Sequence, residues 1–202
     1  MNTLYTIGHS NHSEDYFIDL LKKCGITAVA DVRSSPYSRY NPHFNRENII
    51  RTLKNHNIAY VFLGKELGPR ADDPSCYVDG KVSYRRLAET QLFKSGVCRL
   101  EEGMKNYRVT IMCSEKDPIF CHRMVLICRS LRQRDVNIEH ILEDGSHEKL
   151  EDSELRLLAH LKIPALQLFD STENLILRAY EIQAEKIAFK KDEDEGEGKQ
   201  QF

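Results

Sequence analysis

The chain has 202 residues, of which 41% are hydrophobic and 30% charged, and its formal net charge is −2. This composition is ordinary for a globular protein, includes no apolar window long enough to span a bilayer, and lacks the basic surplus of proteins that coat nucleic acids. The first residues do not resemble a signal peptide, so we expect a cytoplasmic protein with no membrane partner and with reduced cysteines.

The first part of the chain alternates short apolar segments with amphipathic ones. Leu4–Ile7 is the first expected strand, and Ser13 is the N-cap of the helix that follows. Thr27–Val32 is apolar on both faces, which is typical of a strand inside a parallel sheet. A second helix is expected after Asn45, and Ile58–Leu63 is the third strand.

The middle of the chain continues this alternation. Ser83 begins a helical segment that we expect to reach Lys105, with a break near Gly96. Tyr107–Met112 is the fourth expected strand, and Asn137–Leu142 is the fifth.

The end of the chain is helical, with expected helices at Asp152–Leu161 and Thr172–Phe189. Strands that alternate with helices predict an α/β fold: a mainly parallel, roughly five-stranded sheet flanked by helices in a Rossmann-like three-layer arrangement, with a helical C-terminus. We expect residues 1–190 to form one domain and residues 191–202 to be a disordered acidic tail.

Polar residues follow four of the expected strands. Right-handed crossovers place the carboxyl ends of parallel strands at the same edge of a sheet, where open α/β sheets bind their ligands. We therefore expect four polar groups to meet there: Gly8–Ser10, Asp31 with Arg33, Gly64–Glu66 and Cys113–Glu115.

The richest of these segments is Cys113–Arg123. Asp117 and Pro118 suit the N-cap and first position of an amphipathic helix, which would place Cys121 and the two residues after it near the first helical turn. The positive end of the helix dipole and the guanidinium of Arg123 would both favour a thiolate there.

Five motifs taken together resemble the domain of unknown function 488 family. They are Thr6–Ser10, Asp31–Arg39, Leu63–Gly68, Cys113–Arg123 and His140–Gly145, and the resemblance covers about Leu4 to Leu150. The resemblance implies an α/β fold and marks these motifs as a shared site. It implies no substrate or activity.

Our leading hypothesis is that the strand edge binds a phosphate-bearing ligand, either a nucleotide or a nucleic-acid end. Guanidinium groups hold phosphates, and the loop Arg33–Arg46 interleaves arginines with aromatic rings on which bases could stack. The expected ligand-binding residues are Ser10, Arg33, Ser35, Tyr37, Arg39, Lys65, His122 and Arg123. The alternative is that this loop binds no ligand and is a rigid, proline-containing segment packed over the sheet edge.

If the protein is an enzyme, the candidate catalytic residues are His9, Asp31, Cys113, Glu115 and Cys121. A thiol would act as nucleophile, while the carboxylates and His9 would move protons or position the ligand. Hydrolase or transferase chemistry fits these groups better than redox chemistry, because no dinucleotide-binding motif is present. Each carboxylate could equally form an ion pair or cap a loop.

Two other interpretations stay open. A zinc ion could be bound by Cys113, Cys121 and His122, with His9 as a further candidate ligand. The spacing of these residues matches no standard zinc motif. In addition, the adjacent Cys121 and His122 would point in different directions on a helix. The protein could also be a non-catalytic module that binds nucleic acid or protein, with the cysteines bracing its loops. The sequence requires no cofactor and indicates no oligomeric state.

Overall fold

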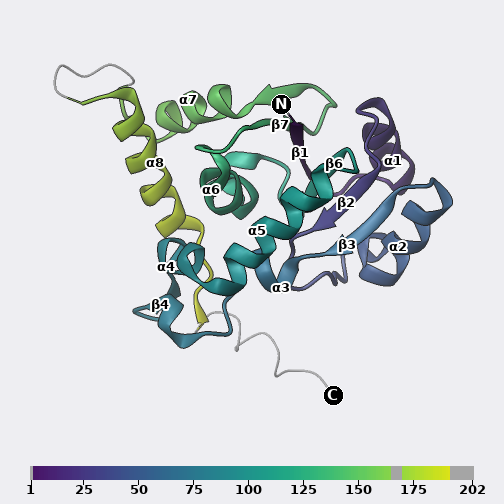
Figure 1. Ribbon diagram of the computed structural model, residues 1–202, viewed down its shortest axis with the longest axis horizontal. Coiled ribbons are helices and arrows are strands. Elements are labelled where there is room, and N and C mark those ends of the chain that lie inside the picture. The colour runs from purple at the N-terminus through teal and green to yellow at the C-terminus, as the bar shows by residue number, and fades with distance from the viewer. Residues whose placement is uncertain (1, 165–169, 192–202) are drawn as a thin grey trace.

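A six-stranded sheet runs through the computed structural model, which describes residues 2–164 and 170–191 (Figure 1). Within these ranges the strand order is β3-β2-β6-β1-β7-β8. The strands are β1 (Asn2–Gly8), β2 (Ala28–Asp31), β3 (Ala59–Phe62), β6 (Val109–Cys113), β7 (Val136–Ile141) and β8 (His147–Lys149). Neighbours pair in parallel except β7 and β8. The predicted α/β fold is confirmed, and β8 is the strand of this sheet that the sequence did not predict.

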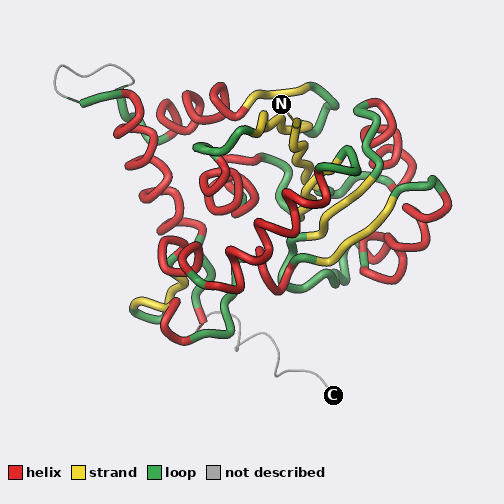
Figure 2. Tube along the Cα trace, in the orientation of Figure 1, coloured by secondary structure: helices red, strands yellow, loops and turns green. Residues whose placement is uncertain are grey.

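Helices connect these strands (Figure 2). The α-helices are α1 (Glu14–Lys23), α2 (Arg46–Asn55), α3 (Gly64–Leu67), α4 (Tyr84–Glu89), α5 (Gln91–Met104), α6 (Arg129–Leu131), α7 (Leu150–His160) and α8 (Thr172–Ile187). The π-helix η4 (Arg123–Cys128) leads directly into α6. The short 3-10 turns are η1 (Pro42–Phe44), η2 (Pro74–Cys76) and η3 (Pro118–Phe120), and a small hairpin joins β4 (Tyr77–Val78) to β5 (Lys81–Val82).

Side chains alternate between two cores, one on each face of the sheet. On β2, Val29 packs into the core formed with α1 and α2, whereas Ala28 and Ala30 face the core formed with α5 and η4. On β6, Met112 and Cys113 divide in the same way. The alternation follows from the two-residue period of a strand, and it gives the three layers that the sequence predicted.

The helix predicted from Ser83 to Lys105 is interrupted at Thr90, where α4 ends and α5 begins, and not near Gly96. Thr90 has an extended backbone, and its hydroxyl accepts a hydrogen bond from the N–H of Phe93 as an N-cap. Gly96 instead lies buried within α5, where a Cβ would come within 2.5 Å of Glu66 Cβ. The glycine therefore permits α3 to pack closely against α5.

The predicted domain of residues 1–190 stays a prediction, and residues 192–202 of the predicted tail lie outside the described residues. Lys191 is described, and its N–H donates to the carbonyl of Gly80 at 3.0 Å. None of the described helices is both long enough and apolar enough to cross a lipid bilayer.

A buried histidine lies within the core near β1. Thr6 Oγ1 accepts a hydrogen bond from Arg123 Nε at 3.3 Å and is hydrogen-bonded to Nδ1 of His140 at 2.7 Å. The buried Nε2 atom of His140 has no partner among the described residues. Burial first, and then the charges of Arg123 and Arg156, lower the pKa of His140 from 6.5 to about 3.

We predict that His140 makes the protein less stable as the pH falls. An unfolded chain protonates this histidine near pH 6.5, whereas the folded protein resists protonation down to about pH 3. Its contribution to stability is therefore complete above pH 6.5 and lost by up to about 1.4 kcal/mol per pH unit below it. Urea unfolding at several pH values should show a shallower dependence for His140→Gln than for the wild type.

The imidazole NMR signals of His140 provide a check that does not depend on the variant folding. They should not titrate between pH 8 and pH 5 in the folded protein. A midpoint near pH 6.5 would contradict this prediction.

Candidate functional site

The carboxyl ends of β1, β2, β3 and β6 lie at one edge of the sheet, as the sequence predicted, so Gly64–Glu66 follows β3 at this edge. Gly8 at the end of β1 is in register with Cys113 at the end of β6, and Asp31 at the end of β2 is in register with Met112. The N–H of His9 donates to the carbonyl of Cys113 at 2.8 Å, which joins the segments beyond the strands. Strand alternation, however, divides the polar side chains between the two faces of the sheet.

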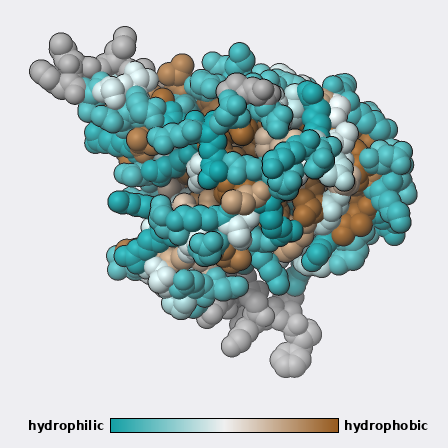
Figure 3. All heavy atoms as spheres, in the orientation of Figure 1, coloured by the Kyte–Doolittle hydropathy of each residue, from teal (hydrophilic) through white to brown (hydrophobic). Residues whose placement is uncertain are grey.

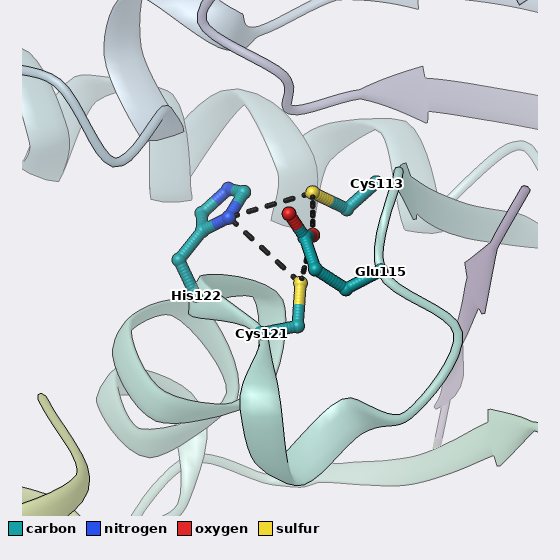
Figure 4. A group of neighbouring side chains, drawn as sticks. All are labelled: Cys113, Glu115, Cys121 and His122. Carbon is teal, nitrogen blue, oxygen red and sulfur yellow. Dashed lines mark hydrogen bonds between the residues drawn. The ribbon is translucent and has the colours of Figure 1, made fainter. Parts of the chain in front are cut away.

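On the face covered by η4, four side chains converge (Figure 4). Their ligand atoms all lie within 4.8 Å of one another, and the residues are Cys113, Glu115, Cys121 and His122. The two thiols donate to the same carboxylate oxygen, Oε2 of Glu115, at 2.8 Å from Cys113 and 3.0 Å from Cys121. Nδ1 of His122 lies 3.5 Å from Sγ of Cys113 and 3.9 Å from Sγ of Cys121. We call these four residues the thiol cluster.

The backbone around Cys121 explains how two adjacent residues reach the same point. Asp117 and Pro118 begin η3, not the longer helix that the sequence predicted. Cys121 follows this turn with extended backbone angles (φ −126°, ψ 141°), and only from His122 onward is the backbone helical. Because Cys121 is not helical, its side chain and that of His122 turn toward each other. The sequence-based objection to a shared ligand set assumed a continuous helix and was wrong.

Hydrogen bonding fixes the tautomer of His122. Its Nε2 lies 3.1 Å from the carbonyl oxygen of Val32, which can only accept, so Nε2 carries a proton. Nδ1 therefore presents its lone pair to the two thiols whenever the ring is neutral. Histidines that bind metals commonly have this arrangement, with a carbonyl or carboxylate orienting the ring from behind.

The loop that carries Glu115 is held in place by Arg123, which is fully buried. Its guanidinium donates to the carbonyl oxygens of Glu115 and Lys116, and its Nε donates to Thr6. A phosphate at this guanidinium would have to displace these bonds. The backbone N–H of Arg123 also points to Sγ of Cys121, at 3.4 Å.

Burial controls the protonation of the cluster. Burial raises the pKa of Cys121 well above its usual value, and the neighbouring Cys113 raises it further, so the thiolate predicted at Cys121 is wrong for this geometry. The pKa of Glu115 is lowered overall. Burial alone would raise it, but hydrogen bonds from the two thiols have the larger combined effect. Burial lowers the pKa of His122, whereas Cys121 and Glu115 reverse this effect and raise it.

On the opposite face, His9, Asp31 and Arg33 form a second buried group. Arg33 makes a two-pronged ion pair with Asp31, at 2.9 and 2.6 Å, and donates to the carbonyl of Phe44. Nδ1 of His9 donates to the carbonyl of Ser10, which leaves Nε2 to accept from Arg33 at 3.1 Å. Burial and Arg33 lower the pKa of His9 to about 4. His9 therefore does not belong to the thiol cluster.

The other predicted ligand-binding residues lie on the surface. Ser35, Arg39 and Lys65 are exposed, and the hydroxyl of Tyr37 donates to Glu47. Ser10 donates to its neighbour Asn11. None of these five described residues contacts a cysteine of the cluster, and binding of a phosphate-bearing ligand by them stays a prediction.

Two contributions were not recognised from the sequence. Glu115 was assigned to acid–base chemistry, although the pattern Cys-x-Glu before Cys121-His122 could have indicated a fourth ligand. Tyr60 was not singled out at all, yet its hydroxyl donates to Asp31 at 3.0 Å. Only the pairing of β3 with β2 brings that hydroxyl near the carboxylate.

Comparison with known proteins identifies a family. The family described as "Domain of unknown function DUF488" matches residues 13–129, more than half of the chain. The match includes the whole thiol cluster as well as Asp31 and Arg33, but it ends before His140. No curated protein and no solved structure gave a match.

We predict that Gly8→Ala destabilises the protein. A Cβ at Gly8 would lie 1.9 Å from the carbonyl oxygen of Glu115, so the loop that Arg123 holds would have to move. The expected loss is about 1–3 kcal/mol, measured by urea unfolding. Gly103→Ala in α5 is the matched control because its Cβ would meet only Val109, at 4.0 Å, and it should be neutral or stabilising. Equal stability of the two variants would contradict the prediction.

Proposed function

This chain belongs to the family described as Domain of unknown function DUF488, and we propose that it is a metal-binding protein whose thiol cluster binds one zinc ion. The observation that carries the proposal is the convergence of two sulfurs, one imidazole nitrogen and one carboxylate oxygen within 4.8 Å. Two thiolates, an imidazole and a carboxylate are a donor set that suits zinc.

The distances support tetrahedral coordination. With a Zn–S distance of about 2.3 Å and a Zn–N distance of about 2.0 Å, a tetrahedral site separates sulfur from nitrogen by roughly 3.5 Å. The corresponding separations in the cluster are 3.5 and 3.9 Å. The carboxylate lies closer to the sulfurs than a shared metal would allow, and it would withdraw by roughly half an ångström. Glu115 is the exposed residue of the cluster, although its carboxylate lies against the buried thiols.

Charge balance supports the same proposal. Zinc carries two positive charges and replaces two thiol protons, so the net charge of the cluster is −1 before and after binding. The buried cation Arg123 therefore has the same countercharge beside it in both states. The N–H of Arg123 toward Cys121 and the bond from His122 to Val32 are the outer contacts that orient zinc ligands in proteins.

The position of Glu115 at the edge of the cluster offers a route to chemistry at the metal. Cys113, Cys121 and His122 are at most 4% exposed, whereas Glu115 reaches the surface. If Glu115 detached, three protein ligands would hold the zinc, and a water or substrate oxygen could take the fourth position. Hydrolase chemistry, one of the two reaction classes considered from the sequence, would then use a zinc-bound water without a free thiolate nucleophile.

We predict that the purified protein contains one zinc ion per chain. Elemental analysis should give a ratio near one for the wild type and near zero for Cys113→Ser with Cys121→Ser. Cys98→Ser is the matched control, since Cys98 is exposed and lies outside the cluster, and it should keep the metal. A folded wild-type protein that neither contains zinc nor takes it up from solution would end the proposal.

We also predict an unequal contribution from the four ligands. Glu115→Ala should keep cobalt(II), with absorption bands of tetrahedral coordination that change when an added anion takes the position left by the missing carboxylate. His122→Ala should bind cobalt(II) more weakly than Glu115→Ala because it removes a buried, oriented ligand. Identical cobalt affinities for the two variants would show that Glu115 is not the replaceable position.

A further inference from the structure

The outer edge of β3 is an open end of the main sheet. Among the described strands β3 is terminal and pairs with β2 alone. Ala59 and Leu63 donate their N–H groups to Thr27 and Asp31 of the β2 side. Hydrogen-bonding direction alternates along a strand, so the N–H and C=O groups of Tyr60 and Phe62 point away from the sheet. An open edge of this kind can pair with another extended chain.

Hollows lie along this edge. One of about 890 Å³ lies along β3 between α2 and α3, and Ile50, Tyr60 and Phe62 contribute to its walls. A second, of about 450 Å³, adjoins the α5 face of β3 and includes Val61. Figure 3 shows hydrophobic residues gathered over the part of the molecule where Figure 1 draws β2 and β3, with hydrophilic residues around them. The side chains on the two faces of a strand added to β3 could occupy these two hollows.

The rim of the larger hollow is basic. Arg46, Lys54, Lys65 and Arg99 line it, and the acidic residue among the lining residues, Glu66, is paired with Arg99. Within the described part of the chain, Arg46, Lys54 and Lys65 form no ion pair, and the guanidinium of Arg46 lies over the ring of Phe62. The edge thus combines unpaired backbone groups with basic side chains that form no ion pair with the described residues.

We propose that the β3 edge is a docking site for an extended acidic segment of a partner protein, which adds a strand beside Tyr60 and Phe62. Backbone hydrogen bonds would supply affinity, while Lys54 and Lys65 would select acidic side chains. Charge argues against a second copy of this chain as the occupant, because edge-to-edge pairing would bring the basic rims together. The docking site is separate from the thiol cluster and does not depend on zinc.

Binding can be tested on the full chain with a fluorescein-labelled decapeptide of alternating valine and glutamate. Fluorescence anisotropy should show saturable binding that weakens as salt rises. Lys54→Glu combined with Lys65→Glu should weaken it at least about tenfold, since both side chains are exposed and unpaired. Lys22→Glu combined with Lys23→Glu, on the exposed end of α1, is the matched control and should leave binding unchanged.

Three further measurements distinguish strand addition from other binding. A decapeptide with N-methylated peptide bonds and a valine–lysine decapeptide should both fail to bind. Hydrogen exchange at the amides of Tyr60 and Phe62 should slow when the acidic peptide is present. Phe62→Pro removes one outward N–H without touching the β2 ladder and should weaken binding while circular dichroism stays unchanged.

Several outcomes would overturn the proposal. They are no binding of the acidic decapeptide, equal binding by the N-methylated peptide, and equal binding by the Lys54 and Lys65 double variant. Binding of a nucleotide or a short oligonucleotide at this edge in place of the peptide would assign the hollow to a phosphate ligand instead. A concentration-dependent dimer that Phe62→Pro abolishes would assign the edge to self-association.

Discussion

The buried guanidinium of Arg123 is the constraint on which the arrangement at the sheet edge depends. No carboxylate of the described residues accepts from it, and it instead donates to the carbonyls of Glu115 and Lys116 and to the hydroxyl of Thr6. A buried cation must be hydrogen-bonded to be tolerated, so the loop between β6 and η4 has to curl back over Arg123. That path brings the Glu115 carbonyl against Gly8 and turns the Glu115 side chain toward the thiols.

The same edge holds two polar groups with different chemistry, because strand ends that share an edge still project side chains to opposite faces. Cys113 faces η4, where sulfur, nitrogen and oxygen donors converge, and no arginine or lysine side chain in the described part of the chain is hydrogen-bonded to these donor atoms. Asp31 faces α2, where Arg33 neutralises it and His9 stacks on Phe44 at 4.3 Å. The thiol cluster therefore has atoms that can coordinate a metal, whereas Asp31 and Arg33 are already paired with each other. This difference is why the proposed function rests on the thiol cluster.

The zinc proposal and the docking proposal concern separate parts of the molecule. The thiol cluster lies at the carboxyl end of β6, which is an interior strand of the sheet, and three of its four residues are buried. The β3 edge lies at the margin of the sheet and offers backbone groups with basic side chains around them. Family membership extends over both, because residues 13–129 include β3 and the whole cluster.

The sequence by itself determined the α/β class, the positions of five strands and the meeting of their polar ends, because apolar periodicity and crossover handedness are local and general. It also named Cys113, Cys121 and His122 as candidate metal ligands. Only the tertiary structure decided that Glu115 joins them and His9 does not. The reason is physical: Cys121 is extended because η3 ends before it, and His9 follows a strand whose pleat turns it to the other face. Such choices depend on contacts between distant segments, which no local pattern encodes.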